Sequence, residues 1–345
     1  MTGNKISEKY ASFKGTTQEQ INRALETIWD ETGFNSEEEV FRGLIYDNKK
    51  VSTFIMKGSV SAEPMVLKIQ FLKPDIEEGL MISKLKEQSL SERIAPPKTH
   101  VFKEWNAHRG YGFMLQEWVK GNRIFEMPYA LEVEMREFCG FYEEYKTKLV
   151  RKPWLTIPEN DKDSVRFVLE RARKWKDISE KQKRVIPLPE FGDRFEAFGE
   201  RVKKRFSGIP MEFMHGHLST NDILRRPNGT YVIMSNAFWS WRPKGYDLLF
   251  NIWSCLLRMR DSEVFFDLYK PSMDWLEAYD RNLESFEKGW IFKNFNALLL
   301  ERVMGSLLLD IGSEILAREG IEGDVALNLQ NAHMDLLDWL LDDLR

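Results

Sequence analysis

The sequence predicts an α+β protein in two parts, a small antiparallel β-rich part with one helix and a larger, mainly helical part. Strand-like runs separated by turn signals fill residues 36–118, and from about residue 128 apolar side chains recur at helical spacing to the end of the chain. With 345 residues, 43% of them hydrophobic and 13% aromatic, the chain can bury the core of one large or two moderate domains.

A helix is predicted first, over the stretch "TTQEQINRALETIWDE". Thr17 can cap this helix, because Gln20 follows three residues later as a capping box requires. Ile21, Leu25 and Ile28 then form one apolar face. This helix makes residues 1–35 an N-terminal helical extension.

Three strands follow in the predicted small lobe, which spans residues 36–118. They are "VFRGLIY", "VSTFIMK" and "MVLKIQF", joined by the polar turn "DNKK" and by the longer connection "GSVSAEP". A helix is predicted over "DIEEGLMISKLKEQ", and another strand begins "YGFMLQEWVKG". The stretch with His108 and Arg109 before that strand is typical of a polar hairpin turn.

Residues 119–345 form the predicted large lobe, which is helical apart from one β island. Helical periods run through "YALEVEMREFCGFYEEYKTKL", "DSVRFVLERARKWKDI" and "RFEAFGERVKKRF", and again through the tail. Between them, "DILRRPNGTYVIM" carries the hairpin signal "PNG". Within the segment 213–247, the tryptophans Trp239, Trp241 and Trp253 are expected to belong to the core rather than to a substrate pocket.

Charge and composition exclude several classes of function. The net charge is −4 and no basic stripe occurs, which argues against a nucleic-acid partner. Two cysteines, Cys139 and Cys255, exclude a disulfide framework. No apolar run approaches the ~20 residues of a membrane span, and the first residues lack the pattern of a signal peptide. We therefore expect a cytoplasmic protein that has no membrane partner.

Specific residues then carry a resemblance. The string "HGHLSTNDIL" (residues 215–224) is similar to the catalytic loop H-G-D-L-x-x-x-N-I-L, and "GYDLLFNIW" follows it. Upstream, "MVLKIQ" and "FMLQEWVKG" stand in the matching order. Together these motifs resemble the aminoglycoside phosphotransferase and choline kinase branch of the protein-kinase-like fold, over roughly residues 36–260. The resemblance implies a bilobal fold with a cleft between Lys68 and the segment 215–236.

The resemblance also implies roles for individual residues. Lys68 would hold the α- and β-phosphates of ATP, with Glu78 as its ion-pair partner and Glu77 as the fallback. The backbone around Gln116 to Trp118 would meet the adenine. The catalytic loop would supply His215, His217 and Asp222, while Asp247 would anchor the loop by hydrogen bonds.

This sequence departs from the family pattern at the positions that carry the chemistry. His217 replaces the aspartate that accepts the hydroxyl proton, and Asp222 replaces an asparagine that binds the metal. The second metal position falls on Ser235, or on Met234 if the register is counted from the preceding strand. The turn that covers the phosphates, at "YDNKK", has no glycine, although Lys49 or Lys50 could touch a phosphate. ATP is thus the expected cofactor. Asp222 is a competent oxygen ligand for Mg²⁺, but neither Ser235 nor Met234 is a strong one, which counts against Mg²⁺.

Two readings remain open, so the sequence does not decide whether the chain is an enzyme. In the first, the protein is a pseudokinase-like member with impaired chemistry that binds a nucleotide or small ligand, and a protein partner is then open too. In the second, it is an active small-molecule kinase that transfers a phosphoryl group from ATP to a hydroxyl, with His217 as the base. Acidic residues of the large lobe recruit amino-bearing substrates in the family. Glu284, Glu287 and Asp310 lie in the matching part of this chain, but nothing in the sequence assigns that role to them, and no substrate follows from them.

Overall fold

A computed structural model of the chain describes residues 13–45, 50–123, 132–150, 152–159, 162–181, 191–256, 269–282, 289–311 and 323–345. The chain divides into two compact units, each assembled from separate stretches of sequence. The first unit comprises Met1–Glu87, Ala95–Asn122 and Leu224–Ala237, and the second comprises Gln88–Ile94, Arg123–Ile223 and Phe238–Arg345. A five-stranded antiparallel sheet with a mainly helical remainder confirms the predicted α+β class.

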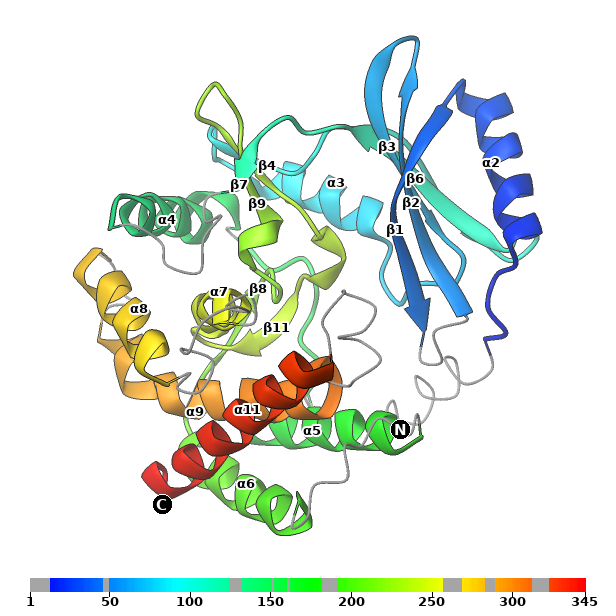
Figure 1. Cartoon of the computed structure of the whole chain (residues 1–345). Coiled ribbons are helices and arrows are strands. Elements are labelled where there is room, and N and C mark those ends of the chain that lie inside the picture. The colour runs from blue at the N-terminus through cyan, green and yellow to red at the C-terminus, as the bar shows by residue number, and fades with distance from the viewer. Residues whose placement is uncertain are drawn as a thin grey trace. The chain divides into compact units, whose positions relative to one another are not determined.

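The first unit is built on a sheet with the strand order β1-β2-β3-β6-β5, in which every neighbouring pair is antiparallel (Figure 1). Its strands are β1 (Asn35–Ile45), β2 (Lys50–Val60), β3 (Glu63–Gln70), β5 (Thr99–Asn106) and β6 (Tyr111–Glu117). Alternation along β3 turns Leu67 and Ile69, both fully buried, toward one face of the sheet and the half-buried Lys68 toward the other.

Helix α2 (Gln18–Thr32) covers the face that bears Leu67 and Ile69 (Figure 1). Its N-terminus has the predicted capping box, in which Thr17 accepts from the Gln20 N–H and the Gln20 side chain accepts from the Thr17 N–H. Ile21, Ala24 and Ile28 of α2 join a core of sheet residues. That core contains Phe34, Val51, Phe54, Met65, Leu67, Ile69, Phe71, Tyr111, Phe113 and Leu115.

The connection between β2 and β3 differs from the predicted one. Strand pairing continues to Val60 opposite Glu63, so the seven-residue connection "GSVSAEP" is a turn of two residues. Ser61 and Ala62 both have positive φ, at 50° and 68°, which is the backbone that a tight two-residue hairpin requires. Serine and alanine rarely adopt this conformation, so the sequence carries no turn signal at this position.

Strand β5 is absent from the sequence-based strand assignment. The strand pairs with β6 through an irregular register and exposes much of its length, so its side chains do not alternate cleanly between apolar and polar. The predicted polar turn with His108 and Arg109 does join β5 to β6, where Asn106 accepts from both of their backbone N–H groups. The turn "DNKK" between β1 and β2 lies almost wholly outside the described residues, and for Lys50 the structure gives only its backbone, in β2.

Most of helix α3 (Glu78–Gln88) and most residues of a small second sheet also belong to the first unit. In that sheet the order is β4-β10-β9-β7, formed by β4 (Ile94–Ala95), β7 (Asn122–Arg123), β9 (Ile223–Arg225) and β10 (Tyr231–Ile233). Strands β9 and β10 are the predicted β island, and the "PNG" turn lies between them with Gly229 at a φ of 80°.

The second unit is mainly helical, as predicted. Its helices are α4 (Glu132–Glu144), α5 (Ser164–Lys181), α6 (Phe191–Arg205), α7 (Tyr246–Leu256), α8 (Tyr269–Asn282), α9 (Trp290–Gly305) and α11 (Gly323–Asp343). Wider π-helical turns extend α4 over Tyr145–Leu149 and α9 over Ser306–Asp310, and β8 (Met211–Met214) pairs with β11 (Ser240–Pro243).

Helix α9 is the centre of this unit because it is buried on nearly all sides. It packs against α5, α6, α7 and α11. The buried Trp239 and Trp253 confirm the core prediction for these two tryptophans, whereas Trp241 is half-buried. None of the helices formed by the described residues combines the length and the apolar character needed to cross a membrane.

Candidate functional site

Lys68 and Glu78 form an ion pair on the face of the sheet opposite α2. The Lys68 Nζ lies 2.5 Å from Glu78 Oε2, with the two side chains 25% and 12% exposed. Glu77 is engaged elsewhere, because its carboxylate accepts from the Trp105 backbone N–H at 2.9 Å. Glu77, just before α3, and Glu78, its first residue, therefore each have a partner of their own, and Glu78 positions the lysine ammonium.

Glu78 also holds the segment that follows β10. Its other oxygen, Oε1, accepts from the Asn236 N–H at 2.8 Å. Ser235, one residue earlier, has a φ of 56°, a left-handed conformation that is uncommon for residues other than glycine and collects at functional sites. The first unit thus brings together Lys68, Glu78 and the position at which the resemblance places a metal-binding aspartate.

Gln116, Glu117 and Trp118 lie at the end of β6, where the resemblance places the adenine-binding segment. The Gln116 side chain is 8% exposed and lies 3.4 Å from Thr99 Oγ1. The backbone N–H groups of Glu117 and Trp118 donate to carbonyl oxygens within the same unit, at 2.9 Å and 3.1 Å. These two donors are occupied, so adenine recognition by Gln116 and Trp118 stays a prediction.

In the second unit, the catalytic-loop segment brings His217 and Asp222 into contact. His217 Nδ1 lies 3.0 Å from Asp222 Oδ2. The same oxygen accepts from the Ser219 N–H at 3.0 Å and from its hydroxyl at 2.5 Å. These bonds cap the short helical turn Thr220–Asp222. Because Asp222 Oδ2 meets Nδ1, the Nε2 of the imidazole is the ring nitrogen that points away from the carboxylate.

The environment of this pair favours a charged Asp222. The side chain of Asp222 is 3% exposed, and that of His217 is 38% exposed. Burial opposes ionisation of the Asp222 carboxyl, but the hydrogen bond and charge of His217 outweigh it and hold the pKa below its usual value. The imidazole also stacks on Phe238, with ring centroids 4.4 Å apart, which fixes its plane.

Asp247, Tyr145 and the backbone of His215 hold the loop in place through buried hydrogen bonds. Asp247 is fully buried; its Oδ1 accepts from the Gly216 N–H at 2.9 Å and its Oδ2 from the Tyr145 hydroxyl at 2.8 Å. The same hydroxyl accepts from the His215 N–H at 2.8 Å. The supporting role expected for Asp247 is therefore confirmed, and burial raises the pKa of its carboxyl.

Tyr145 and Phe238 belong to this arrangement but were not identified from the sequence. Tyr145 lies 102 positions before Asp247 in a helical pattern typical of core residues, so no local signal marks it. Phe238 lies in the aromatic run "NAFWSW", and such a run is equally typical of core residues.

Of the three acidic candidates for substrate recognition, Glu284 and Glu287 lie outside the described residues, and Asp310 pairs with Arg302.

The residues present do not fit the divalent metal that the resemblance implies. Across the described part of the chain, no group of three or more His, Cys, Asp or Glu side chains could hold a metal ion. At the second ligand position, Met234, Ser235 and Asn236 supply no carboxylate, and the Asn236 amide donates to the Ile233 carbonyl at 2.9 Å. At the first, Asp222 Oδ2 is taken by His217 and Ser219. The assignments of Asp222 and Ser235 as metal ligands stay predictions.

Comparison with known proteins identifies the fold of this chain through similarity of structure. No protein-family model matches the chain, and no curated protein matches it in sequence. Choline kinase LicA from Streptococcus pneumoniae is similar in structure, with a TM-score of 0.59 at 13% identity over 93% of this chain and 100% of that one. A thermostable aminoglycoside phosphotransferase in complex with ADP and hygromycin B gives 0.56 at 9% identity, over 91% and 97%.

An amicoumacin kinase in complex with AMP-PNP, Ca²⁺ and Ami gives a TM-score of 0.53 at 12% identity, over 98% of this chain and 94% of that one. All three proteins have the protein-kinase-like fold of small-molecule kinases. Identities of 9–13% over nearly the whole chain show that this chain shares the fold and has diverged far in sequence. The bilobal kinase-like fold predicted from the motifs is confirmed.

Proposed function

We propose that this protein is a pseudokinase-like member of the aminoglycoside phosphotransferase fold, which binds a nucleotide but is impaired in metal-dependent phosphoryl transfer. One observation carries the proposal. The Lys68–Glu78 pair that would hold the phosphates is intact, whereas the segment beside it offers Ser235 and Asn236 in place of a metal-binding carboxylate. Phosphoryl transfer by this fold depends on metal ions that neutralise the developing charge on the phosphates.

In this proposal Lys68 supplies positive charge to the phosphates, and Glu78 keeps the ammonium in place. The neighbours of similar fold include complexes with ADP and AMP-PNP, which supports a nucleotide as the ligand of this chain. Without a carboxylate at 234–236, binding should depend little on Mg²⁺. A protein that binds a nucleotide but does not transfer its phosphoryl group can still act as a scaffold for a protein partner.

Calorimetric titration of the full chain with ADP, with and without Mg²⁺, tests the proposal. We expect binding that changes little with Mg²⁺ and weakens at least about tenfold in Lys68→Met, since one charge-assisted contact to phosphate is lost. Lys84→Met, on the same α3 helix as Glu78, is the matched control, because Lys84 is exposed and pairs with Glu87. Tight binding that requires Mg²⁺ would refute the impaired-site proposal.

A second candidate function is active transfer with His217 as the base, and the contact between His217 and Asp222 favours it. In this alternative the carboxylate keeps the proton on Nδ1 and leaves Nε2 to accept a proton. The hydroxyl of a small metabolite or an aminoglycoside-like substrate would lose its proton to Nε2 as its oxygen attacks the γ-phosphorus of ATP. The bond from that phosphorus to ADP would break, and the phosphoryl group would pass to the substrate.

The Asp222→Asn variant separates the two candidates, because it restores the residue of the family pattern while removing the charge beside His217. An enzyme that uses His217 should lose most of its ATP-dependent phosphorylation in both Asp222→Asn and His217→Ala. If the parent protein shows phosphorylation that His217→Ala leaves unchanged, His217 is not the base. A gain of metal-dependent ATP hydrolysis in the double variant His217→Asp, Ser235→Asp would instead support the impaired site and its register.

A further inference from the structure

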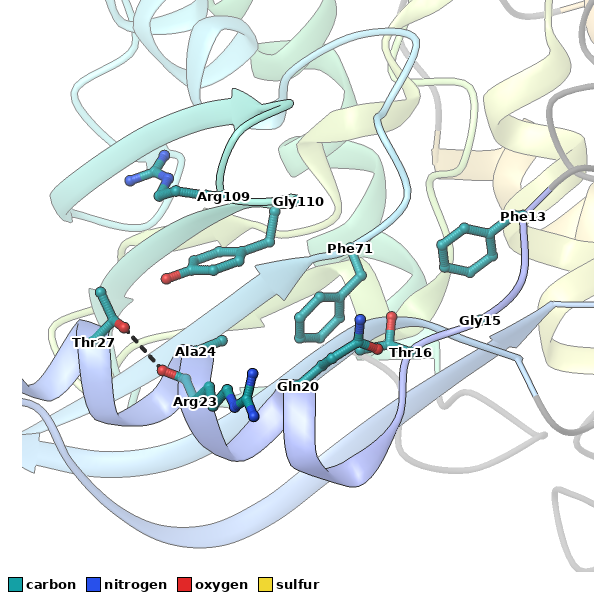
Figure 2. Close-up of a pocket in the computed structure, with 11 residues that line it drawn as sticks. Phe13, Gly15, Thr16, Gln20, Arg23, Ala24, Thr27, Phe71, Arg109 and Gly110 are labelled. Atoms are coloured by element: carbon teal, nitrogen blue, oxygen red, sulfur yellow. Dashed lines mark hydrogen bonds between the residues drawn. The ribbon is translucent and has the colours of Figure 1, made fainter.

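A cavity of about 410 Å³ lies within the first unit, between α2 and the strand ends where β3 finishes and β6 begins. It runs along the first turns of α2, with Phe71 at its middle and Phe13 and Arg109 toward its two ends (Figure 2). The volume is within the range of small-molecule pockets, which is roughly 300–1,000 Å³. Nothing in the kinase-like assignment uses this cavity, since Lys68 points to the opposite face of the sheet from α2.

Three aromatic rings give the cavity its apolar walls. Phe13 precedes α2, Phe71 follows β3, and Tyr111 begins β6. Phe71 and Tyr111 are 6% and 8% exposed and meet edge to face, with centroids 6.0 Å apart. Both belong to the core of the sheet, so this wall is rigid. A rigid aromatic wall favours a flat ligand that can stack or meet a ring edge.

The charged groups that line the cavity are both cationic. Arg23 comes from α2 and Arg109 from the β5–β6 turn, and no acidic side chain of the described residues lines the cavity. Arg23 is exposed and pairs with Glu19, so its charge is already partly balanced. The pKa of the Tyr111 hydroxyl is raised, mainly by burial and to a smaller extent by the negative charge of Glu31, which does not line the cavity. Arg109 is therefore the group that gives the cavity its unbalanced positive charge.

Arg109 is held in place while keeping donors for a ligand. Its Nη2 donates to the Glu104 carbonyl at 3.1 Å, and its guanidinium lies 5.4 Å from the Tyr111 ring centroid and 5.8 Å from that of Phe113. Its Nε is buried and has no hydrogen-bond partner among the described residues. A guanidinium has five N–H donors in a planar fork that matches a carboxylate. The buried Nε has no accessible surface for a ligand, so the N–H groups of Nη1 and Nη2 are the donors of this fixed cation that can meet an anion.

We infer that this cavity is a binding site for a small aromatic carboxylate, whose ring lies against Phe71 and Tyr111 and whose carboxylate meets Arg109. The Thr16 hydroxyl and the Gln20 amide NH₂ add polar groups along the α2 side, whereas the Thr27 hydroxyl donates to the Arg23 carbonyl. Cationic ligands are excluded by the two arginines.

Calorimetric titration of the full chain with naphthalene-2-carboxylate tests this inference, and naphthalene-2-carboxamide is the neutral probe of matched shape. We expect the acid to bind at least about tenfold more tightly than the amide, which corresponds to roughly 1.4 kcal/mol for a charge-assisted contact. Arg109→Gln should remove that preference. Lys103→Gln, an exposed change of the same charge on β5, should preserve it.

A second variant keeps the test valid if Arg109→Gln fails to fold. Thr16 lines the cavity but is not part of the buried core, so Thr16→Trp should fill the space and abolish binding without loss of thermal stability. Equal affinity for the acid and the amide, binding that survives Thr16→Trp, or no heat of binding at millimolar acid would each overturn the inference. None of these results depends on nucleotide binding, so the proposal for Lys68 stands or fails separately.

Discussion

Replacing Tyr145 by phenylalanine tests how the catalytic-loop segment is held. The change removes one hydroxyl that donates to Asp247 Oδ2 and accepts from the His215 N–H, both at 2.8 Å. All three residues are at most 1% exposed, so water cannot replace the lost bonds without opening the core. The variant therefore leaves one buried amide and one buried carboxylate oxygen each short of a partner.

The expected cost follows from these two groups. An unsatisfied buried polar group costs about 1–3 kcal/mol, and more when it is charged, so Tyr145→Phe should lower the free energy of unfolding by about 2–5 kcal/mol. The loss should be largest near neutral pH. Burial raises the pKa of Asp247 and the Tyr145 hydroxyl opposes that rise, so without it the carboxyl takes up a proton more readily. Because the folded state then binds the proton more tightly than the unfolded state, falling pH relieves part of the cost.

Urea denaturation followed by tryptophan fluorescence at pH 7 and pH 5 measures both effects. Tyr111→Phe, which removes a hydroxyl bonded to the neutral Thr27, is the control and should cost no more than about 1.5 kcal/mol. A double-mutant cycle with Asp247→Asn isolates the shared term. If the two changes add within about 0.5 kcal/mol, or if Tyr145→Phe costs no more than Tyr111→Phe, the loop is not held in this way.

Two further predictions concern stability. His333 is buried in α11, and burial lowers its pKa to about 4, so the folded state resists protonation while the unfolded state takes up a proton below about 6.5. Stability should therefore fall by about 2–3 kcal/mol between pH 7 and pH 4.5, and His333→Leu should flatten that decline in urea titrations. A methyl group at Gly79 would lie 2.4 Å from the Phe102 ring, so Gly79→Ala should lower the thermal midpoint, at a cost of about 1–3 kcal/mol. Gly140→Ala, with open space around it in α4, should have no such effect.

The periodicity of apolar residues predicts most helices and strands of the fold, because in these elements the preference of the local sequence agrees with the packing of the folded chain. The apolar face of α2 with its capping box, and the "PNG" turn between β9 and β10, are each specified by neighbouring residues. The turn at Ser61 and Ala62 could not be predicted in this way. Its left-handed backbone is imposed by the pairing of β2 with β3, and the local preference of serine and alanine runs against it.

The candidate site was predictable in its motifs but not in its contacts. Lys68 and Glu78 are ten residues apart in consecutive elements, and the resemblance to the kinase-like family is what implies their pairing. The bond between His217 and Asp222 spans five residues of a loop, where no periodicity fixes the direction of side chains. The support from Tyr145 depends on a helix far away in the sequence, and only the folded chain reveals it.

The departures from the family pattern at His217 and Asp222 can be considered together, because the loop contains one carboxylate in either arrangement. The family pattern places an aspartate and then an asparagine at positions 217 and 222, whereas this chain has His217 and Asp222, so one carboxylate is present in either arrangement. Here that carboxylate lies beneath the imidazole, accepts from Ser219, and has a lowered pKa. If histidine replaced the aspartate at position 217 and asparagine remained at position 222, the loop would contain no carboxylate. In this chain, His217 instead contacts the carboxylate of Asp222, five residues later. The loop therefore contains a paired acid and base, whereas the segment at Ser235 is bonded to Glu78 and has no metal-binding carboxylate.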